Sequence, residues 1–518
     1  MMSSRLRVVI LKPSKYEVDG CLERFRWGFM PNSTVPYMRS MTPAEIRGVR
    51  TEVHAVDEYV HTDVDYLSLL RKEPGTITLL ALVGVQSHQF HRALDLAALA
   101  RENGCLVVIG GPHPMTCDTS MLQGNGVSFA LAEAELIWPA ILNDAVDGEL
   151  RPVYGQDQRW QAELEAPVVT PPSSRDLKRY VVPMLGLYPA RGCPFVCNFC
   201  SVIKIAGRQV RSQAVSTTMQ SLRAAKAAGV RYIMFTSDNF NKYDKAEELL
   251  TAMIDEKLGM NFFVQCDTQI AKQEELVRLL GKAGCFQIFL GVESFNRQTL
   301  IAAKKRQNRP ETYKEIVRLC FAHRISSHFS NIIGFPTDTA ESVEEHMQTL
   351  RELNPNWASF YILCPIPGTE QYDEFQEKGW IWETNLDRFD TTSLTWSHPG
   401  LAAPQLKDLL YQCYSRFYSF GHAVENVYRL HIKTKKALAS IANSVLTRYA
   451  AWQHMHPMAG GVKRVRLDRN VDYFDARKRV FGIHNAPLPR SLALPAADHA
   501  ANKLVNPTFR AKAERAAV

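Results

Sequence analysis

The chain has 518 residues, of which 46% are hydrophobic and 22% are charged. These proportions are those of an ordinary globular protein, and the length allows about three domains of ~150 residues each. No apolar run reaches the ~18 residues of a membrane-spanning helix, and the N-terminus leads into a strand-like run and not into a signal peptide. Eleven cysteines, most of them in apolar stretches, predict a reduced, cytoplasmic setting.

The net charge of +8 is concentrated near the C-terminus. Residues 431–518 hold 16 Lys or Arg against 5 Asp or Glu, and the rest of the chain is slightly acidic. A basic segment is most often a solvated surface, but it also suits peripheral contact with a membrane or another anionic partner. No nucleic-acid-binding motif accompanies the charge, so we do not expect nucleic acid as a partner.

The first 150 residues alternate short apolar runs with amphipathic stretches such as 92–101. Buried strands rich in Val, Ile and Leu that alternate with helices predict an α/β domain with a doubly wound, Rossmann-like parallel sheet. The expected strands are 7–11, 52–56, 76–83, 105–109 and 127–131.

Ligands in such sheets bind beyond the carboxyl ends of the strands. Glycines there would let a bulky planar ligand approach the backbone closely. The candidate residues in three of these turns are Gly84, Gln86, Ser87 and His88, then Gly110, Gly111, Pro112 and His113, then Ala132 and Glu133. Taken singly, His88 and His113 are as well explained as loop residues that bond the backbone.

Residues 151–181 are polar and rich in proline, so they read as a linker. Six strand-like runs separated by helical segments occupy 182–390, too short a stretch for an eight-unit barrel of ~250 residues. The expected strands are 183–188, 232–235, 262–266, 287–290, 328–333 and 358–363.

Residues 391–485 are expected to be helical. Leu406, Leu409, Leu410, Cys413, Phe417 and Phe420 recur there at helical spacing. The segment 486–518, rich in Pro and Ala, is expected to be poorly ordered.

Three cysteines, Cys193, Cys197 and Cys200, follow the first strand of the central region with the spacing C-x3-C-x2-C. Three thiolates on one loop suit a cubic iron–sulfur cluster, which needs one Cys for each iron tied to the protein. No fourth cysteine lies nearby, so one iron would stay open for a small molecule. A zinc knuckle usually takes paired C-x2-C elements, and the odd number of cysteines argues against disulfides.

Turns that could carry chemistry follow the later strands. In chain order they are Ser237-Asp238-Asn239-Phe240, Gln265-Cys266-Asp267, Gly291-Val292-Glu293-Ser294, Ile333-Gly334-Phe335-Pro336 and Pro365-Ile366-Pro367-Gly368-Thr369. Each alone is a common turn or a surface acid. Their order behind the cysteine loop, at one strand–helix spacing, favours a site at the carboxyl ends of barrel strands.

The cysteine spacing, with an aromatic residue before the last cysteine, resembles the signature of the radical S-adenosylmethionine (SAM) superfamily. The resemblance implies a partial (β/α)6 barrel and a catalytic [4Fe-4S] cluster on Cys193, Cys197 and Cys200, whose open iron binds SAM. It also implies a SAM site. Its residues would be Phe199, Ser237, Asp238, Gln265, Glu293, Ser294, Ile333 and Gly334. Ser237 replaces an Asp of the pattern, which leaves open which side chain takes the SAM amine.

The first 150 residues resemble the cobalamin-binding domains that precede many radical SAM barrels. There a Gly-Gly-x-His turn, here at Gly110–His113, and a Gly-Glu-x-Glu-like turn line the corrin. Ala132 and Ala134 replace glycines of the second turn, and the Asp-x-His-x-x-Gly motif that supplies a cobalt ligand elsewhere is absent. The resemblance therefore implies base-off cobalamin without a protein histidine, or an emptied domain.

Together these likenesses imply a cobalamin-dependent radical SAM methyltransferase that acts on an unactivated carbon and consumes two SAM molecules. The plan, including Asp57-Glu58, looks most like the group with the hopanoid methylases, which favours a small apolar or lipid-like substrate. An electron donor such as flavodoxin or ferredoxin is expected. A ring-forming enzyme of the anaerobic porphyrin cyclase type and a non-catalytic cobalamin or cluster sensor are the alternatives. A methylthio-transferring tRNA enzyme fits less well, because its N-terminal domain would need three cysteines for a second cluster, and these are not found here.

Overall fold

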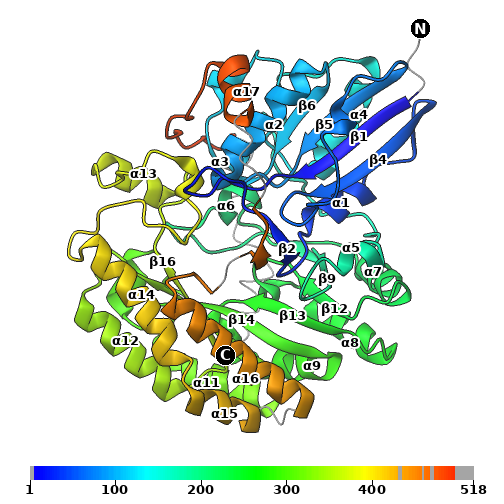
Figure 1. The fold of residues 1–518 in the computed structure, drawn as a ribbon. Coiled ribbons are helices and arrows are strands. Elements are labelled where there is room, and N and C mark those ends of the chain that lie inside the picture. Colours follow the sequence, from blue (N-terminus) through cyan, green and yellow to red (C-terminus); the bar gives the residue numbers. More distant parts are fainter. Residues whose placement is uncertain (1–4, 430–433, 458–459, 467–471, 496–518) are drawn as a thin grey trace.

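The structure is a computed structural model that describes residues 5–429, 434–457, 460–466 and 472–495. Two α/β units lie one above the other in Figure 1, the first built on residues near the N-terminus and the second on the middle of the chain. Helices from the C-terminal part lie against both units.

The first unit is a seven-stranded sheet in which every neighbouring pair is parallel except β3 and β4. Val8 of β1 pairs with Val53 on one side and Leu79 on the other. In spatial order the strands are β3 (Glu45–Ile46), β4 (Val49–Asp57), β1 (Arg5–Lys12), β5 (Thr76–Leu82), β6 (Leu106–Gly110), β7 (Ser128–Ala130) and β8 (Val153–Tyr154). The expected doubly wound α/β sheet is confirmed.

Alternate residues of these strands enter two cores, because side chains of a strand point to opposite faces. Val9 and Leu11 pack with α2 (Phe90–Glu102) on one face. Leu6, Val8 and Ile10 pack with α1 (Thr34–Ser40) and α4 (Ala134–Asp147) on the other.

The second unit is a six-stranded, entirely parallel sheet with β16 and β9 at its two edges, so the barrel is open. In spatial order the strands are β16 (Trp357–Ile362), β15 (Ser326–Ile333), β14 (Cys285–Glu293), β13 (Asn261–Cys266), β12 (Tyr232–Phe235) and β9 (Met184–Leu187). The helices that follow these strands are α7 (Val215–Ala227), α8 (Ala246–Asp255), α9 (Glu274–Ala283), α10 (Arg297–Ala302), α11 (Tyr313–Ala322), α12 (Ala340–Leu353) and α13 (Glu370–Glu377). The six expected strands are all present.

Shorter elements lie between and around these units. They are β2 (Phe25–Gly28), α3 (Pro112–Thr116), α5 (Ser174–Leu177), β10 (Ala190–Arg191), α6 (Val202–Ile205) and β11 (Arg211–Ser212). Single 3-10 turns occur at η1 (Ser68–Leu70), η2 (Ser87–Gln89), η3 (Ser120–Leu122), η4 (Phe240–Lys242), η5 (Thr268–Lys272), η6 (Pro310–Thr312) and η7 (Leu386–Arg388).

The segment 151–181 differs from the expected linker at both its start and its middle. Val153–Tyr154 forms β8, which pairs with β7, so the first sheet extends past residue 150. Arg159, Trp160 and Val169 are buried farther along. The prolines of this segment disfavour long helices, but Val169 joins the core of the second unit and Trp160 donates to the Ile205 carbonyl.

The C-terminal region is helical as expected, with α14 (Ala403–Phe417), α15 (Phe420–Arg429), α16 (Thr434–Trp452) and α17 (Asp472–Phe481). Leu406, Leu410 and Cys413 are buried on α14, as the spacing predicts. Phe420 was wrongly assigned to this stripe, because α14 ends at Phe417 and Phe420 starts the next helix, 70% exposed.

The end of the chain returns to the first unit. The strand β17 (Gly461–Arg464) pairs antiparallel with β2, and α17 packs on α2. The expectation of poor order from residue 486 is wrong for residues 486–495: Ala486 is buried and its amide donates to His91 Nε2 at 2.9 Å. The expectation for 496–518 lies outside the described residues.

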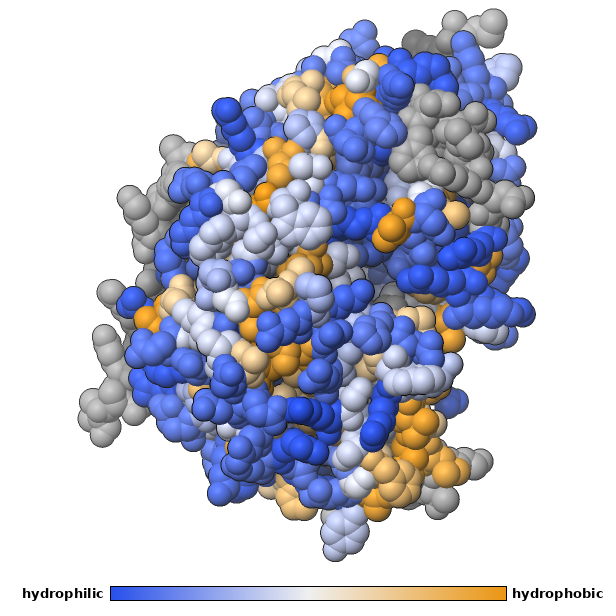
Figure 2. Space-filling view, turned by 60° about the vertical axis from the view of Figure 1, so that its left-hand side comes forward, coloured by the Kyte–Doolittle hydropathy of each residue, from blue (hydrophilic) through white to orange (hydrophobic). Residues whose placement is uncertain are grey.

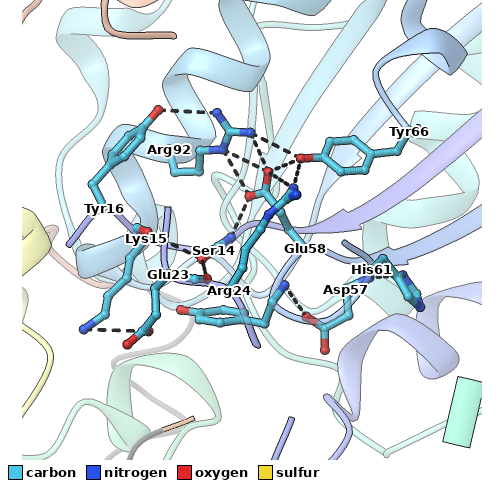
Figure 3. Close-up of polar contacts among 11 residues, drawn as sticks. Ser14, Lys15, Tyr16, Glu23, Arg24, Asp57, Glu58, His61, Tyr66 and Arg92 are labelled. Atoms are coloured by element: carbon cyan, nitrogen blue, oxygen red, sulfur yellow. Dashed lines mark hydrogen bonds and ion pairs between the residues drawn. The ribbon is translucent and has the colours of Figure 1, made fainter. Parts of the chain in front are cut away.

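A buried charge cluster ties β4 to α2 (Figure 3). Glu58, with no exposed surface, accepts from Arg92 Nε at 3.0 Å and from the Ser14 amide at 2.9 Å. Arg24 and Tyr66 complete the cluster. Burial alone would raise the pKa of Glu58, but Arg92 and Arg24 outweigh it and bring this pKa down to about 2. Glu58 thus has a structural role, as a buried carboxylate that links neighbouring elements through Arg92 and the Ser14 amide.

Candidate active site

A cavity of about 290 Å³ lies between the carboxyl ends of the two sheets. Its walls from the first unit include Gly84, Gly110, Gly111, Pro112, Ala132 and Glu133, six of the ten residues expected there. Its walls from the second unit include Tyr188, Arg191, Thr236 and Asp238. The cavity therefore joins the domain expected to bind the corrinoid to the start of the barrel.

The backbone conformation of the turn at Gly110 and Gly111 requires glycine at Gly111. Gly111 has φ of +135°, and a Cβ there would stand 2.2 Å from the amide nitrogen of Val85. No larger residue fits this position without moving the neighbouring loop. The turn holds the ends of β5 and β6 together, because the His113 amide donates to the Val85 carbonyl at 2.9 Å.

Deeper in the first unit the same cavity is apolar. Ala81, Val108 and Ala130 from the sheet face Trp138 and Ile141 from α4. The cavity thus has an apolar part within the first unit and a charged part beside the second.

Four expected cofactor residues do not line the cavity: Gln86, Ser87, His88 and His113. His113 is buried against Phe90, with its Nδ1 3.0 Å from Ser87 Oγ. Burial lowers the pKa of both His88 and His113 to about 3, so both rings are neutral. Their place in the loops gives them packing and hydrogen-bonding roles.

The charged side of the cavity is centred on Arg191, which the sequence analysis did not single out. Its guanidinium lies 2.8 Å from Glu135 and 3.3 Å from Glu133. It also lies over the rings of Tyr37 and Tyr188, 5.2 and 5.0 Å from their centroids. The signal available in the sequence was its position two residues before Cys193.

Asp238 connects this wall to the cysteine loop. Its Oδ2 accepts a hydrogen bond from the Gly192 amide at 2.8 Å, one residue before Cys193. Burial raises the pKa of Asp238. The loop is also fixed by the Cys193 amide, which donates to the Gly207 carbonyl at 3.0 Å.

All eleven cysteines are free, and the three in question share one loop. Burial raises the pKa of the Cys193 thiol, and that of Cys200 to about 12. A coordinated metal removes such protons outright. In the described part of the chain no three His, Cys, Asp or Glu side chains are placed to hold a single metal ion. A cubic cluster differs in that each of its irons takes only one thiolate from the protein.

Hydrogen-bond donors point at two of these sulfurs. Asn239 Nδ2 lies 3.0 Å from Cys193 Sγ, and Gln307 Nε2 lies 3.6 Å from Cys197 Sγ. The Lys305 ammonium lies 5.7 Å from the centroid of the Phe199 ring. Donors and a cation around sulfur stabilise negative charge on thiolates.

Glu293 lies at the end of β14, in a left-handed backbone conformation with φ of +64°. Such a conformation is strained for a residue with a Cβ and is often found at functional sites. Its Oε1 accepts from Lys305 Nζ at 2.8 Å, whereas its buried Oε2 has no partner in the described structure. The Ser237 hydroxyl is also buried without a partner.

The other expected SAM residues are Phe199 in the cysteine loop and residues at or just after the ends of β13, β14 and β15. Ser294 Oγ accepts from the Asn296 amide at 3.1 Å, and Gln265 is half-buried at the end of β13. Ile333 ends β15, and Gly334 follows with φ of +79°. Phe199 meets Phe335, in the turn after Gly334, edge to face, with centroids 6.1 Å apart.

A family model described as the radical SAM superfamily matches residues 187–350. The chain is 27% identical over 307 residues to bacteriochlorophyllide d C-12(1)-methyltransferase of Chlorobaculum tepidum, covering 56% of this chain and 64% of that protein. It is 28% identical over 281 residues to hopanoid C-2 methylase of Rhodopseudomonas palustris, covering 51% and 52%. It is 25% identical over 247 residues to an anaerobic magnesium-protoporphyrin IX monomethyl ester cyclase of Rubrivivax gelatinosus, covering 46% and 42%.

Two solved structures have a similar fold. One is the radical SAM methyltransferase TsrM of Kitasatospora setae with cobalamin and a [4Fe-4S] cluster, with TM-score 0.56 at 18% identity over 72% of this chain and 78% of that one. The other is the cobalamin-dependent radical SAM enzyme OxsB, with TM-score 0.56 at 14% identity over 92% and 79%. Residues 187–350 therefore match the radical SAM superfamily, and the chain shares its fold with these two solved structures. The resemblance to that superfamily inferred from the cysteines is confirmed.

Proposed function

We propose that this chain is a cobalamin-dependent radical SAM methyltransferase that acts on an unactivated carbon of a small, apolar or lipid-like molecule. The observation that carries the proposal is the cavity between the two sheets, which runs from the glycine turn of the first unit to Arg191 and Asp238 beside the cysteine loop. A corrinoid in this cavity would lie next to the cluster loop, as methyl transfer to a substrate in the barrel requires.

The residues fit the three groups that this activity needs. Cys193, Cys197 and Cys200 would hold the cluster, with donors from Asn239 and Gln307 on its sulfurs. The partnerless Glu293 Oε2 and Ser237 hydroxyl would receive hydroxyl or amine groups of SAM. The apolar interior of the cavity and the glycine turn suit the planar ring system and the tail of a corrinoid.

When bound, SAM at the cluster supplies a hydrogen-abstracting radical, and cobalamin supplies a transferable methyl group. The protein's own part is to position and shield these reactants. Glu293 would orient SAM as a hydrogen-bond acceptor, and Lys305 holds its other oxygen in place. Arg191, held by Glu133 and Glu135, fixes the cysteine loop relative to the cavity.

The substrate class rests on the relatives. One is named for a bacteriochlorophyllide and another for a hopanoid, both bulky and mostly apolar molecules. A ring-forming reaction is the second candidate, because a cyclase is also among the relatives. Methylation is the better supported of the two.

The decisive experiment uses the full chain, reconstituted anaerobically with iron, sulfide and a cobalamin, and SAM with a trideuterated methyl group. Incubated with lipid and tetrapyrrole extracts, it should release 5′-deoxyadenosine and add 17 mass units to a product. A Cys197→Ala variant should do neither, and a Cys413→Ala variant, altered at a buried cysteine of α14, should do both. Loss of two hydrogens without labelling would favour the cyclase, and no cleavage of SAM by wild-type protein would overturn the proposal.

The same proposal includes a low-potential electron donor, such as flavodoxin or ferredoxin, and a reducing cytoplasmic location. Eleven free cysteines support the reducing compartment. No helix in the described residues is long and apolar enough to cross a membrane.

A further inference from the structure

The helix α16 carries an apolar stripe that faces away from the protein. Leu438, Val445, Tyr449 and Trp452 recur at spacings of seven, four and three residues, which places them on one side of the helix. All four are more than half exposed, with Trp452 at 70%. The stripe is about 21 Å long at 1.5 Å per residue.

Neighbouring side chains widen this stripe into a face. Leu446 within the same helix and Met455 just after it are also more than half exposed, and Phe420 and Tyr428 of α15 are 70% and 80% exposed. Figure 2 shows apolar surface at the lower right, on the side to which its rotation brings α15 and α16. Exposed apolar faces of this extent mark interaction sites.

A shallow hollow separates the two helices. It has a volume of about 300 Å³ and lies between Phe420 and Ala423 on one side and Val445, Arg448 and Tyr449 on the other. Apolar walls with a single guanidinium suit a molecule that has an apolar body and an anionic group.

The charge of this region indicates which kind of partner the exposed apolar face would bind. From residue 426 to residue 467 the chain has eight Lys or Arg and no Asp or Glu. Arg464 and Arg466 of this stretch pair with acids near residues 17–23, and Arg448 is exposed beside the stripe. Basic residues beside an apolar face with Trp, Tyr and Leu are the composition of helices that lie in a membrane interface.

We propose that the face formed by α15 and α16 docks on the surface of an anionic lipid bilayer. The aromatic and aliphatic side chains of the stripe enter the headgroup boundary, and the exposed Arg448 beside them is attracted by anionic lipids. The inference rests on exposure and charge alone, so it holds or fails independently of the reaction proposed above.

Co-sedimentation of the full chain with vesicles tests this proposal. Vesicles of phosphatidylcholine with 30% phosphatidylglycerol should bind the protein, and pure phosphatidylcholine vesicles or 0.5 M NaCl should reduce binding. A Tyr449→Ser, Trp452→Ser double variant should bind at least tenfold more weakly, since each lost side chain removes buried apolar area. The matched control is Trp382→Ser, which removes a Trp that is 53% exposed elsewhere.

Circular dichroism would verify that each variant is folded. Equal vesicle binding by wild type and the double variant would overturn the proposal. So would absence of vesicle binding together with a dimer in sedimentation velocity that the double variant abolishes, because the face would then pair with a second copy of the chain.

Discussion

The carboxylate of Glu293 has one oxygen available to bind a ligand. One oxygen bonds Lys305 and the other is buried without a partner. Glu293→Gln keeps the shape and removes the charge, so a charge-assisted bond worth ~1.5–3 kcal/mol is lost. We expect the Kd for SAM, measured by equilibrium dialysis on anaerobic protein, to rise about ten- to a hundredfold.

The control for this change is iron content, which should stay at the wild-type value. A second control, Glu341→Gln, removes an acid at the start of α12, away from the cysteine loop. A normal SAM affinity in Glu293→Gln would mean that this carboxylate serves only as the partner of Lys305.

The side-chain amide of Asn239 should raise the midpoint potential of the cluster. It donates to Cys193 Sγ at 3.0 Å, and such donors stabilise the more negative, reduced cluster. Asn239→Leu should therefore lower the midpoint potential, by the order of the ~59 mV that a tenfold change in a one-electron ratio represents. Redox titration followed by electron paramagnetic resonance measures this shift. Gln307→Leu should shift it less, since its contact with Cys197 is 3.6 Å long; an equal shift in both would contradict this reasoning.

At the scale of elements, β4 and α2 are joined by the buried pair of Glu58 and Arg92. Glu58→Gln removes the carboxylate charge that pairs with the buried Arg92, which costs about 3–5 kcal/mol of the free energy of unfolding. The pKa of Glu58 is lowered to about 2 in the folded state, so its contribution is complete above its ordinary pKa near 4.5 and fades toward 2. Urea unfolding of both proteins should give a difference that is constant from pH 8 to 5 and shrinks below 4.5; a constant difference at pH 3 would contradict this assignment.

Most elements of the sequence analysis were found within a few residues, because each core strand is an unbroken apolar run between turns. The strands β2 and β17 were not foreseen, since they are short and pair across more than 430 residues of chain. Arg191 was missed for a related reason. Its role depends on Glu133 and Glu135, which the fold brings to it from another domain. The cysteines were found because their spacing is local, whereas the partners of their sulfurs come from separate turns.

At the scale of the whole molecule, the first sheet completes its core with distant residues. Tyr372, Leu386, Phe389 and Ala486 belong to the same apolar core as α2. Asp95 of that helix, with no exposed surface, lies 3.7 Å from Arg477 of α17. The predicted cobalamin-binding domain is thus a compact sheet whose outer layer comes from the end of the chain.

This dependence predicts that residues 1–154 will not fold alone, although they contain the complete seven-stranded sheet. Without α17 and the segment around residue 386, α2 loses apolar contacts and Asp95 loses the charge of Arg477, so the net stability of ~5–15 kcal/mol typical of a domain should vanish. The fragment should lack a cooperative thermal transition in circular dichroism, and a chain ending at residue 466 should melt well below the full chain. Retention of a corrinoid by the fragment, with a sharp transition, would show instead that the first sheet is self-sufficient and that α17 is only an external cover.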